Sequence, residues 1–396
     1  MSLALEGIRV VDFTRFLAGP YCTMMLADLG AEVIKIERPG SGDDSRAYGP
    51  FLENESLYFI SVNRGKKSIS LNLKNPEARK FVLDLIDTAD IVVENFKPGV
   101  MDRLGFSYQT LSKRNPRLIY CSCSGYGQTG PCAAMPAYDL IIQGITGMMS
   151  ITGPDPEHPS KVGMSVADID TGMFAALGCI AALYQREKTG HGQQIDIALF
   201  DVLMAILENA ATRTLNTGKP PTAIGNRHVT ICPFASIRAS DGFFNIAAGN
   251  DTLFAKLAAA HEDPDMAADP RFLTNDSRLQ HWPDLEARLN AAASKKTIAE
   301  WCEILDKAGV PAGPLNHMDQ ALNHPQIQAR NIVTTIHHPE VGDVKCIASP
   351  VHLSEGTRES YESSPTVGED SVDYIAEILG CTIEEAQRIV DNKEFE

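Results

Sequence analysis

The chain has 396 residues, of which 44% are hydrophobic and 22% are charged, and this composition predicts a globular protein with a large core in two lobes. A formal net charge of −16 argues against nucleic acid or an anionic membrane surface as the main partner. An anionic small ligand therefore requires a local cluster of basic residues. Nine cysteines without regular spacing argue against a disulfide framework and favour a reducing compartment.

The N-terminal segment, "MSLALEGIRVVDF", lacks the basic stretch and long apolar run of a signal peptide. The longest apolar run, residues 173–184, is too short to cross a bilayer. We therefore expect a cytoplasmic protein without a membrane partner.

Strand and helix patterns alternate along the first third of the chain. Asn75 followed by Pro76 is typical of a helix start, with Asn75 as the N-cap. Strands that alternate with helices predict an α/β fold with a parallel sheet covered on both faces. The predicted strands are 8–13, 32–37, 67–73, 90–96 and 118–124, and the predicted helices are 19–30, 75–89 and 100–112.

This lobe should continue through a helix at 173–187, a strand at 193–200 and one long helix at 201–218. A Gly/Pro-rich linker follows at 218–228, and strands and helices between 234 and 323 predict a smaller α+β lobe. A hairpin within 337–353 should return to the first lobe, and a C-terminal helix should start with a capping box at Thr382. The expected boundaries are 1–217 with 330–396 for the large lobe, and 225–329 for the small lobe.

Several familiar motifs do not account for the function. The stretch "GYGQTG", Gly125 to Gly130, matches the dinucleotide-binding pattern, but Pro131 and Pro136 interrupt the helix that this pattern requires. We interpret it as a glycine-rich turn. The sequence has neither a P-loop nor a nucleophile elbow, and its histidines do not have metal-ligand spacing.

Basic residues gather in the loops that follow the predicted strands. In open parallel sheets, ligands bind beyond the carboxyl ends of the strands, where guanidinium groups and helix N-termini suit phosphates. A solvated rim of surface ion pairs is the alternative explanation. The residues are Arg15, Arg38, Arg46, Lys97 and Arg103.

Two carboxylates, Asp168 and Asp170, precede a long apolar helix and are separated only by Ile169. Asp170 is a natural N-cap, which leaves Asp168 just before the helix among small and apolar residues. A carboxylate in that position can act as a nucleophile toward an acyl group, although Asp168 can equally cap a turn.

These segments resemble the class III CoA-transferases, the CaiB–BaiF family. The resemblance covers nearly the whole chain and includes "LEGIRVVDFTRFLAGPYCTMMLADLGAEVIKIERPGSGDDSR", "ADIVVENFKPGVMDRLGF" and "VADIDTGMFAALGCIAALYQREKTGHGQQIDIALFD". It implies a Rossmann-like large lobe, an interlocked homodimer, and transfer of coenzyme A from an acyl-CoA to a free carboxylic acid. Asp168 matches the catalytic aspartate, which passes through an aspartyl mixed anhydride and an aspartyl-CoA thioester. Coenzyme A is then a substrate, and the resemblance implies neither a tightly bound cofactor nor a metal.

The resemblance also implies residues that contact the substrates. Leu17 stands where formyl-CoA transferases have glutamine, which weakens an assignment to formyl-CoA and oxalate. The segments "PAYDLIIQ", "TGKPPTAIGNRH" and "GNDTLFAKL" resemble the branch that uses acetyl- or succinyl-CoA with small dicarboxylic acids such as oxalate or glutarate. Phe16 and Leu71 can instead be packing residues, and Asn95 can merely cap a turn. The implied CoA contacts are Phe16, Leu17, Arg38, Leu71, Asn95, Phe96, Lys97, Arg103 and Tyr138, and the implied substrate loop contains Ala248, Gly249 and Asn250.

Two alternatives remain at this point. Racemases of the same family act on 2-methylacyl-CoA substrates and carry a histidine before an aspartate, where this chain has Tyr138 and Asp139. Without that imidazole one of the two bases required for racemisation is missing. A non-catalytic nucleotide-binding α/β protein is the second alternative, and the intact Asp168 argues against it.

Overall fold

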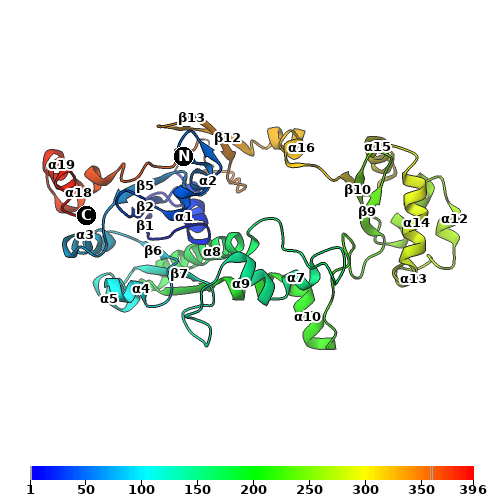
Figure 1. The fold of residues 1–396 in the computed structure, drawn as a ribbon, viewed down its shortest axis with the longest axis horizontal. Helices are drawn as coiled ribbons and strands as arrows, with labels where there is room; N and C mark the ends of the chain where they lie inside the picture. Colours follow the sequence, from blue (N-terminus) through cyan, green and yellow to red (C-terminus); the bar gives the residue numbers. More distant parts are fainter. Residues whose placement is uncertain (1, 357, 359) are drawn as a thin grey trace. The chain divides into compact units, whose positions relative to one another are not determined.

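The computed structural model describes residues 2–356, 358 and 360–396. The chain forms two compact units, which are described separately. Unit 1 comprises Met1–Met148, Val162–Ala211 and Gln326–Glu396, and unit 2 comprises Met149–Lys161 and Thr212–Pro325. Figure 1 traces the elements of each unit along the chain.

Unit 1 is built on a six-stranded sheet in which all paired strands are parallel, as predicted. The order reverses between β1 and β6, because β2 and β5 continue on one side of β1 and β7 and β8 on the other side of β6. Such a reversal creates a crevice beyond the carboxyl ends of the strands. The strands, in spatial order, are β5 (Lys66–Ser70), β2 (Glu32–Glu37), β1 (Arg9–Asp12), β6 (Ile91–Glu94), β7 (Ile119–Ser124) and β8 (Gln194–Ala198).

Both faces of this sheet are covered, because the central strands carry apolar side chains on both sides. Helices α1 (Ala18–Asp28) and α8 (Val166–Thr189) pack on one face, around Cys22, Leu26 and Cys179 (Figure 1). The other face is covered by α3 (Pro76–Asp87), α5 (Tyr108–Arg114), α18 (Ser371–Leu379) and α19 (Ile383–Asp391).

Several helix starts were predicted correctly from residues close to them in the sequence. The side chain of Asn75 caps α3 as predicted, and Thr382 forms a capping box at α19. Two predicted single helices are each divided. Gly105, with a φ of 90°, separates α4 (Val100–Leu104) from α5, and Leu207 separates α9 (Leu199–Ile206) from α10 (Glu208–Thr217). Leu207 has no sequence signal for a break.

Smaller elements complete unit 1 around the sheet. A hairpin in this part of the chain belongs to unit 1, as predicted, but its strands span Val333–Ile347 rather than 337–353. The two strands are antiparallel, with Val333 opposite Ile347 and His338 opposite Gly342. These elements are β3 (Phe51–Leu52), β4 (Glu55–Ser56), α2 (Leu57–Asn63), α6 (Asp139–Ile145), α17 (Pro325–Ala329), β12 (Val333–His338) and β13 (Gly342–Ile347).

Unit 2 has its own core, in which Phe244 and Trp301 stack with ring centroids 6.4 Å apart. Its antiparallel sheet has the order β11–β10–β9, and helices pack against it. The elements are β9 (Phe234–Arg238), β10 (Phe243–Ala247), α11 (Asp251–Ala260), α12 (Asp265–Ala268), α13 (Asn275–Gln280), α14 (Trp282–Ala293), α15 (Ile298–Ala308), β11 (Ala312–Pro314) and α16 (Met318–Leu322).

Helix α8 is long and apolar enough to cross a membrane by length and composition. This helix is longer than the apolar run at residues 173–184, which by itself is too short to cross a bilayer. Ala175, Ala176 and Cys179 of α8 are nevertheless buried in the core of unit 1. A core helix passes the same test, so this helix is explained by packing.

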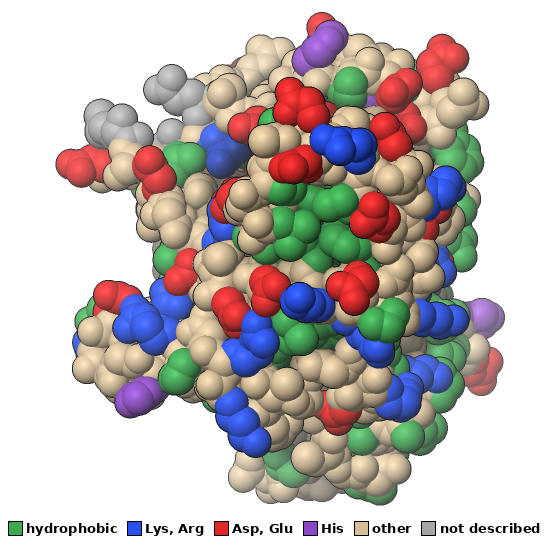
Figure 2. All heavy atoms as spheres, turned by 90° about the vertical axis from the view of Figure 1, so that its left-hand side faces the viewer, with side chains coloured by type: hydrophobic (Ala, Val, Ile, Leu, Met, Phe, Trp, Pro, Cys, Tyr) green, Lys and Arg blue, Asp and Glu red, His purple; other side chains and the backbone are tan. Residues whose placement is uncertain are grey.

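Figure 2 shows the face of unit 1 that carries α3, α18 and α19, where acidic and basic side chains are interspersed around apolar ones. Arg114, for example, forms ion pairs with Asp84 and Asp87. Neither sign of charge dominates this face, so a concentrated anion-binding surface has to be sought at the strand ends.

Candidate active site

A cavity of about 190 Å³ lies beyond the carboxyl ends of β5, β2, β1 and β6. Its walls combine apolar side chains with the guanidinium groups of Arg15 and Arg38 and the ammonium group of Lys74. Such a lining suits a ligand that has both an aromatic ring and phosphate groups. The lining residues are Phe13, Thr14, Arg15, Lys35, Ile36, Glu37, Arg38, Gly42, Asp43, Leu71, Asn72, Leu73, Lys74, Phe96 and Leu104.

Three of the expected CoA contacts, Arg38, Leu71 and Phe96, line this cavity. The other six lie outside its lining. Leu71 is buried, as its packing alternative required, whereas Phe16 is only partly buried. Leu17 is buried as well, and Lys97, Arg103 and Tyr138 are exposed.

The loop after β1 is held in a strained conformation. Phe16 has a φ of 65°, a left-handed backbone that a bulky side chain rarely adopts. Asn95 fixes Arg15, the residue before Phe16, from both sides. The Asn95 side chain accepts a hydrogen bond from the Arg15 N–H at 2.9 Å and donates one to the Arg15 carbonyl at 2.7 Å. Asn95 therefore shapes this loop rather than capping its own turn.

A buried ion pair lies behind the same loop, and the sequence analysis missed it. The Lys35 ammonium group is 2.8 Å from Asp43 and donates to the Thr14 carbonyl at 2.7 Å. Both charged side chains are fully buried, and Asp43 also accepts from the Phe16 N–H. A lysine inside the apolar run "EVIKIE" is the sequence signal that could have revealed the pair.

The positive charges of the basic residues predicted at the strand ends are partly neutralised by ion pairs. Arg15 and Arg38 both pair with Asp44, and Arg46 pairs with the buried Glu37. Among the described residues, Lys97 and Arg103 form no ion pair, so they are the rim cations left for an external anion.

Asp168 lies in the first turn of α8, and Asp170 lies inside the helix. The prediction that Asp170 is the N-cap and that Asp168 precedes the helix is therefore wrong. The Asp139 carboxylate, from α6, accepts from the Ala167 N–H at 2.9 Å and so caps α8 from outside. Gln143 holds Asp139 in place with a hydrogen bond of 2.7 Å. A cap supplied 28 residues away leaves no local sequence signal.

The environment of Asp168 opposes its ionisation. Burial, together with the nearby negative charge of Asp139, raises the pKa of Asp168 from 3.8 to about 7. Burial and the Asp168 charge in turn raise the pKa of Tyr58, on α2, to about 12. A carboxylate that is half ionised near neutral pH is more basic and more nucleophilic than an ordinary aspartate.

Close packing of α8 on α1 sets the direction in which Asp168 points. A Cβ atom on Gly172 would lie 2.7 Å from the Ala18 carbonyl oxygen, so only glycine permits this approach. Asp168 precedes Gly172 by four residues and shares its helix face. The next residue, Ile169, packs with Leu17. Asp168 thus lies on the face of α8 that packs against α1.

The expected substrate loop belongs to unit 2. Ala248 is fully buried, and its N–H donates to the Pro233 carbonyl at 2.9 Å. A Cβ atom on Gly249 would lie 2.3 Å from Ile231, and the Asn250 side chain caps α11. These three residues therefore have structural roles within unit 2.

The "GYGQTG" segment lies between β7 and α6 and forms turns, with positive φ at Gly127 and Gly130. This agrees with its interpretation as a glycine-rich turn. Across the described residues, no group of histidine, cysteine or acidic side chains could hold a metal ion. All nine cysteines are free.

Comparison with known proteins identifies the family. The sequence profile of CoA-transferase family III matches residues 5–371. The chain is 47% identical over 350 residues to the acetyl-CoA:oxalate CoA-transferase of Acetobacter aceti, covering 88% of this chain and 89% of that protein. It is 38% identical to the succinyl-CoA:glutarate CoA-transferase of Mus musculus, covering 95% of this chain and 86% of that protein.

Solved structures agree with these sequence relationships. A CaiB/BaiF family protein from Brucella suis superposes with a TM-score of 0.86 at 39% identity, covering 96% of this chain and all of that one. The chain therefore belongs to CoA-transferase family III. The resemblance to class III CoA-transferases, and with it the expectation of a CoA-transferase enzyme, is confirmed.

Proposed function

We propose that this enzyme transfers coenzyme A from an acyl-CoA to a small dicarboxylic acid, with Asp168 as the nucleophile. The observation that carries the proposal is the position of Asp168 in the first turn of α8, in a chain that belongs to CoA-transferase family III. The raised pKa of its carboxyl group supports the proposal. The names of the relatives, which include oxalate and glutarate transferases, support a dicarboxylic acid as the acceptor.

In the proposed reaction, the acceptor acid replaces the donor acid in the thioester with coenzyme A. The Asp168 carboxylate attacks the thioester carbonyl, the carbon–sulfur bond breaks, and CoA thiolate leaves a mixed anhydride behind. The thiolate then attacks the aspartyl carbonyl, which releases the donor acid and forms an aspartyl-CoA thioester. The acceptor carboxylate attacks the same carbonyl and displaces the thiolate, which finally attacks the acceptor acyl carbon and frees Asp168.

The cavity at the strand ends is proposed to hold part of the CoA molecule. Its apolar walls at Leu71 and Phe96 would accept the adenine ring, and Arg38 would contact a phosphate group. Lys97 and Arg103, which are exposed and form no ion pair within the described part of the chain, would neutralise further phosphate charge. Coenzyme A enters as a substrate in this scheme and leaves as a product.

We also propose that the enzyme is a homodimer. Apolar side chains on α6 and α8 are about half exposed or more in the single chain, among them Ile141, Ile145 and Leu177. An exposed apolar area of this kind usually marks an interface between proteins. Light scattering on the purified protein will give the mass: twice that of the chain supports the proposal, and a monomer overturns it.

A transfer assay tests the proposed reaction. Purified enzyme is incubated with acetyl-CoA or succinyl-CoA and a panel of free mono- and dicarboxylic acids, and new acyl-CoA species are detected by mass spectrometry. A dicarboxyl-CoA product confirms the proposal and names both substrates. Deuterium uptake at the α-carbon of a 2-methylacyl-CoA, without transfer, would instead indicate the racemase.

A further inference from the structure

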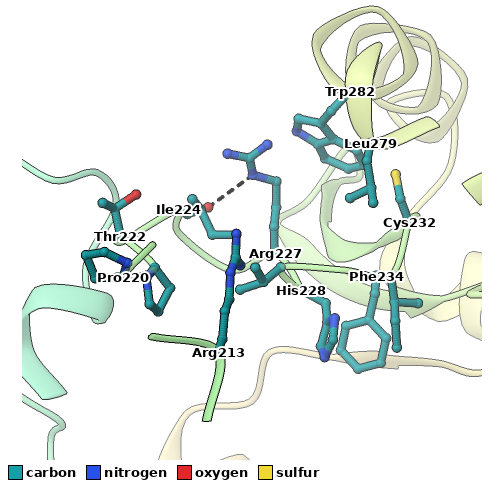
Figure 3. A pocket seen from close by; sticks show the side chains of 13 residues that line it. Arg213, Pro220, Thr222, Ile224, Arg227, His228, Cys232, Phe234, Leu279 and Trp282 are labelled. Carbon is teal, nitrogen blue, oxygen red and sulfur yellow. Dashed lines mark hydrogen bonds between the residues drawn. The ribbon is translucent and has the colours of Figure 1, made fainter. Parts of the chain in front are cut away.

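The side chains that hold the start of α8 belong to unit 1, the unit that contains Asp168. The pocket drawn in Figure 3, of about 310 Å³, is a feature of unit 2, to which all of its lining residues belong. Within the described chain, the charged group that acts on Asp168 is Asp139, which also belongs to unit 1.

The start of α8 has no cap from its own segment. Ser165 occupies the N-cap position, but its side chain forms no capping hydrogen bond. The Ala167 N–H donates instead to the Asp139 carboxylate of α6 at 2.9 Å. A helix start without a cap leaves its first N–H groups unsatisfied and is less stable. The position of Asp168, which directly follows Ala167, therefore depends on Asp139.

Gln143, one helical turn after Asp139 on α6, holds the same segment at its other end. Its Nε2 donates to the Asp139 carboxylate at 2.7 Å, and its Oε1 accepts from the Val162 N–H at 2.8 Å. Gln143 is fully buried, and Asp139 is 8% exposed. The Asp139–Gln143 pair thus holds both ends of the segment at 162–167 that leads to Asp168.

The Asp168 carboxylate has no comparable support of its own. Among the described residues it forms neither a hydrogen bond nor an ion pair, and its surroundings act on it through burial and through the charge of Asp139. A nucleophile without a strong partner is free to attack, but its direction must then be set by the backbone that carries it. That backbone is the first turn of α8, which the Asp139–Gln143 pair holds.

Asp139 also brings a negative charge to the start of the helix. A helix N-terminus ordinarily favours an ionised carboxylate. Burial is the larger cause of the raised pKa of Asp168, and the charge of Asp139 is the second. Tyr58 of α2 also faces Asp168 but stays protonated, because its pKa is raised to about 12. Tyr21 of α1 faces Asp170 instead.

We propose that Asp139 and Gln143 are positioning residues for CoA transfer, which together fix the backbone from which Asp168 attacks. The charge of Asp139 has a second effect, since it makes the Asp168 carboxylate a stronger nucleophile. The inference rests on the proposed function, in which Asp168 forms the covalent intermediates. Position and charge are separable, because Gln143 contributes to the first only and Asp139 contributes to both.

Two variants separate these effects. Asp139→Asn retains an oxygen that can accept from the Ala167 N–H, but it removes the charge. Gln143→Leu removes both hydrogen bonds of the glutamine and leaves the Asp139 charge in place. Asp201→Asn makes the same chemical change as Asp139→Asn at an exposed residue of α9, and it should behave as the wild type. Thermal unfolding checks that each variant is folded.

The readout is kcat/KM for acetyl-CoA with oxalate, or for the substrate pair that the transfer assay identifies, between about pH 5 and 9. The wild-type profile under the same conditions accounts for titration of the substrates. Asp139→Asn should move the midpoint down by about half a pH unit or more and lower the plateau about twofold or more. Gln143→Leu should lower the rate about tenfold or more at every pH without moving the midpoint.

The outcomes distinguish this inference from the proposed function. If the wild type transfers CoA but Asp139→Asn keeps the wild-type midpoint, or Gln143→Leu keeps the wild-type rate, the inference is overturned and the proposed function stands. A wild type that transfers CoA to none of the acids overturns the proposed function.

Urea denaturation tests the action of Asp139 on Asp168 without any substrate. Stabilisation by Asp168→Asn should be complete at a pH about half a unit lower in the Asp139→Asn background than in the wild type. An unchanged pH would overturn the effect of the Asp139 charge, whatever the enzyme transfers.

Discussion

Replacing Asp168 by asparagine should stabilise the protein, and the gain should depend on pH. The folded state holds the Asp168 proton up to about pH 7, whereas an ordinary aspartate loses it near pH 3.8. Ionisation of Asp168 therefore lowers the free energy of unfolding. This cost is absent below about pH 3.8, grows as the pH rises toward 7, and is complete above about pH 7. At about 1.4 kcal/mol per pH unit, the full cost has an upper bound of about 4 kcal/mol.

Asparagine has nearly the same shape but cannot ionise, so Asp168→Asn removes this cost. Between about pH 5.5 and 8.5 the advantage of the variant over the wild type should grow by about 2 kcal/mol. Urea denaturation at equal protein concentrations measures the free energy of unfolding at both pH values. Asp201→Asn, which alters an exposed residue of α9, is the control and should show the same difference at both. An Asp168→Asn advantage that does not change with pH, or that shrinks as pH rises, would refute the reasoning.

Three further predictions follow from the site. Lys35→Met leaves the buried Asp43 carboxylate without its ion-pair partner. This substitution should lower the free energy of unfolding, measured by urea denaturation, by about 3–5 kcal/mol. A loss below about 1 kcal/mol would contradict the prediction. Gly172→Ala forces α8 away from α1 and should cost about 1–3 kcal/mol, whereas Gly178→Ala, whose new methyl meets only a side chain at 3.3 Å, should be neutral or stabilising; equal effects would contradict it. The rate of CoA transfer should rise about tenfold per pH unit below pH 7 and level off above it, because only ionised Asp168 is nucleophilic; a rate independent of pH would count against this role.

The parallel sheet and several helix caps could be predicted because their signals are local. Asn75 with Pro76, and Thr382 with Glu385, mark helix starts within four residues. The start of α8 could not be predicted in the same way, because its cap comes from Asp139 on another helix.

The candidate site was likewise predictable only where its signals are local. The loops that bear Arg38 and Phe96 were predicted from strand ends, and both side chains line the cavity. The strained backbone at Phe16 depends on contacts with the loops that follow β2 and β6, and the buried Lys35–Asp43 pair joins β2 to the loop after it. A pattern along the chain does not record these contacts.

The most direct test of the central claim is to trap the acyl group or coenzyme A on Asp168 during turnover. Hydroxylamine converts an aspartyl anhydride or thioester into a stable hydroxamate, which peptide mapping by mass spectrometry can locate. Enzyme treated with acyl-CoA and then hydroxylamine should carry the hydroxamate at Asp168 only, and omission of acyl-CoA should abolish it. Continued CoA transfer with an unmodified Asp168, or with a hydroxamate at Asp170 instead, would contradict the account.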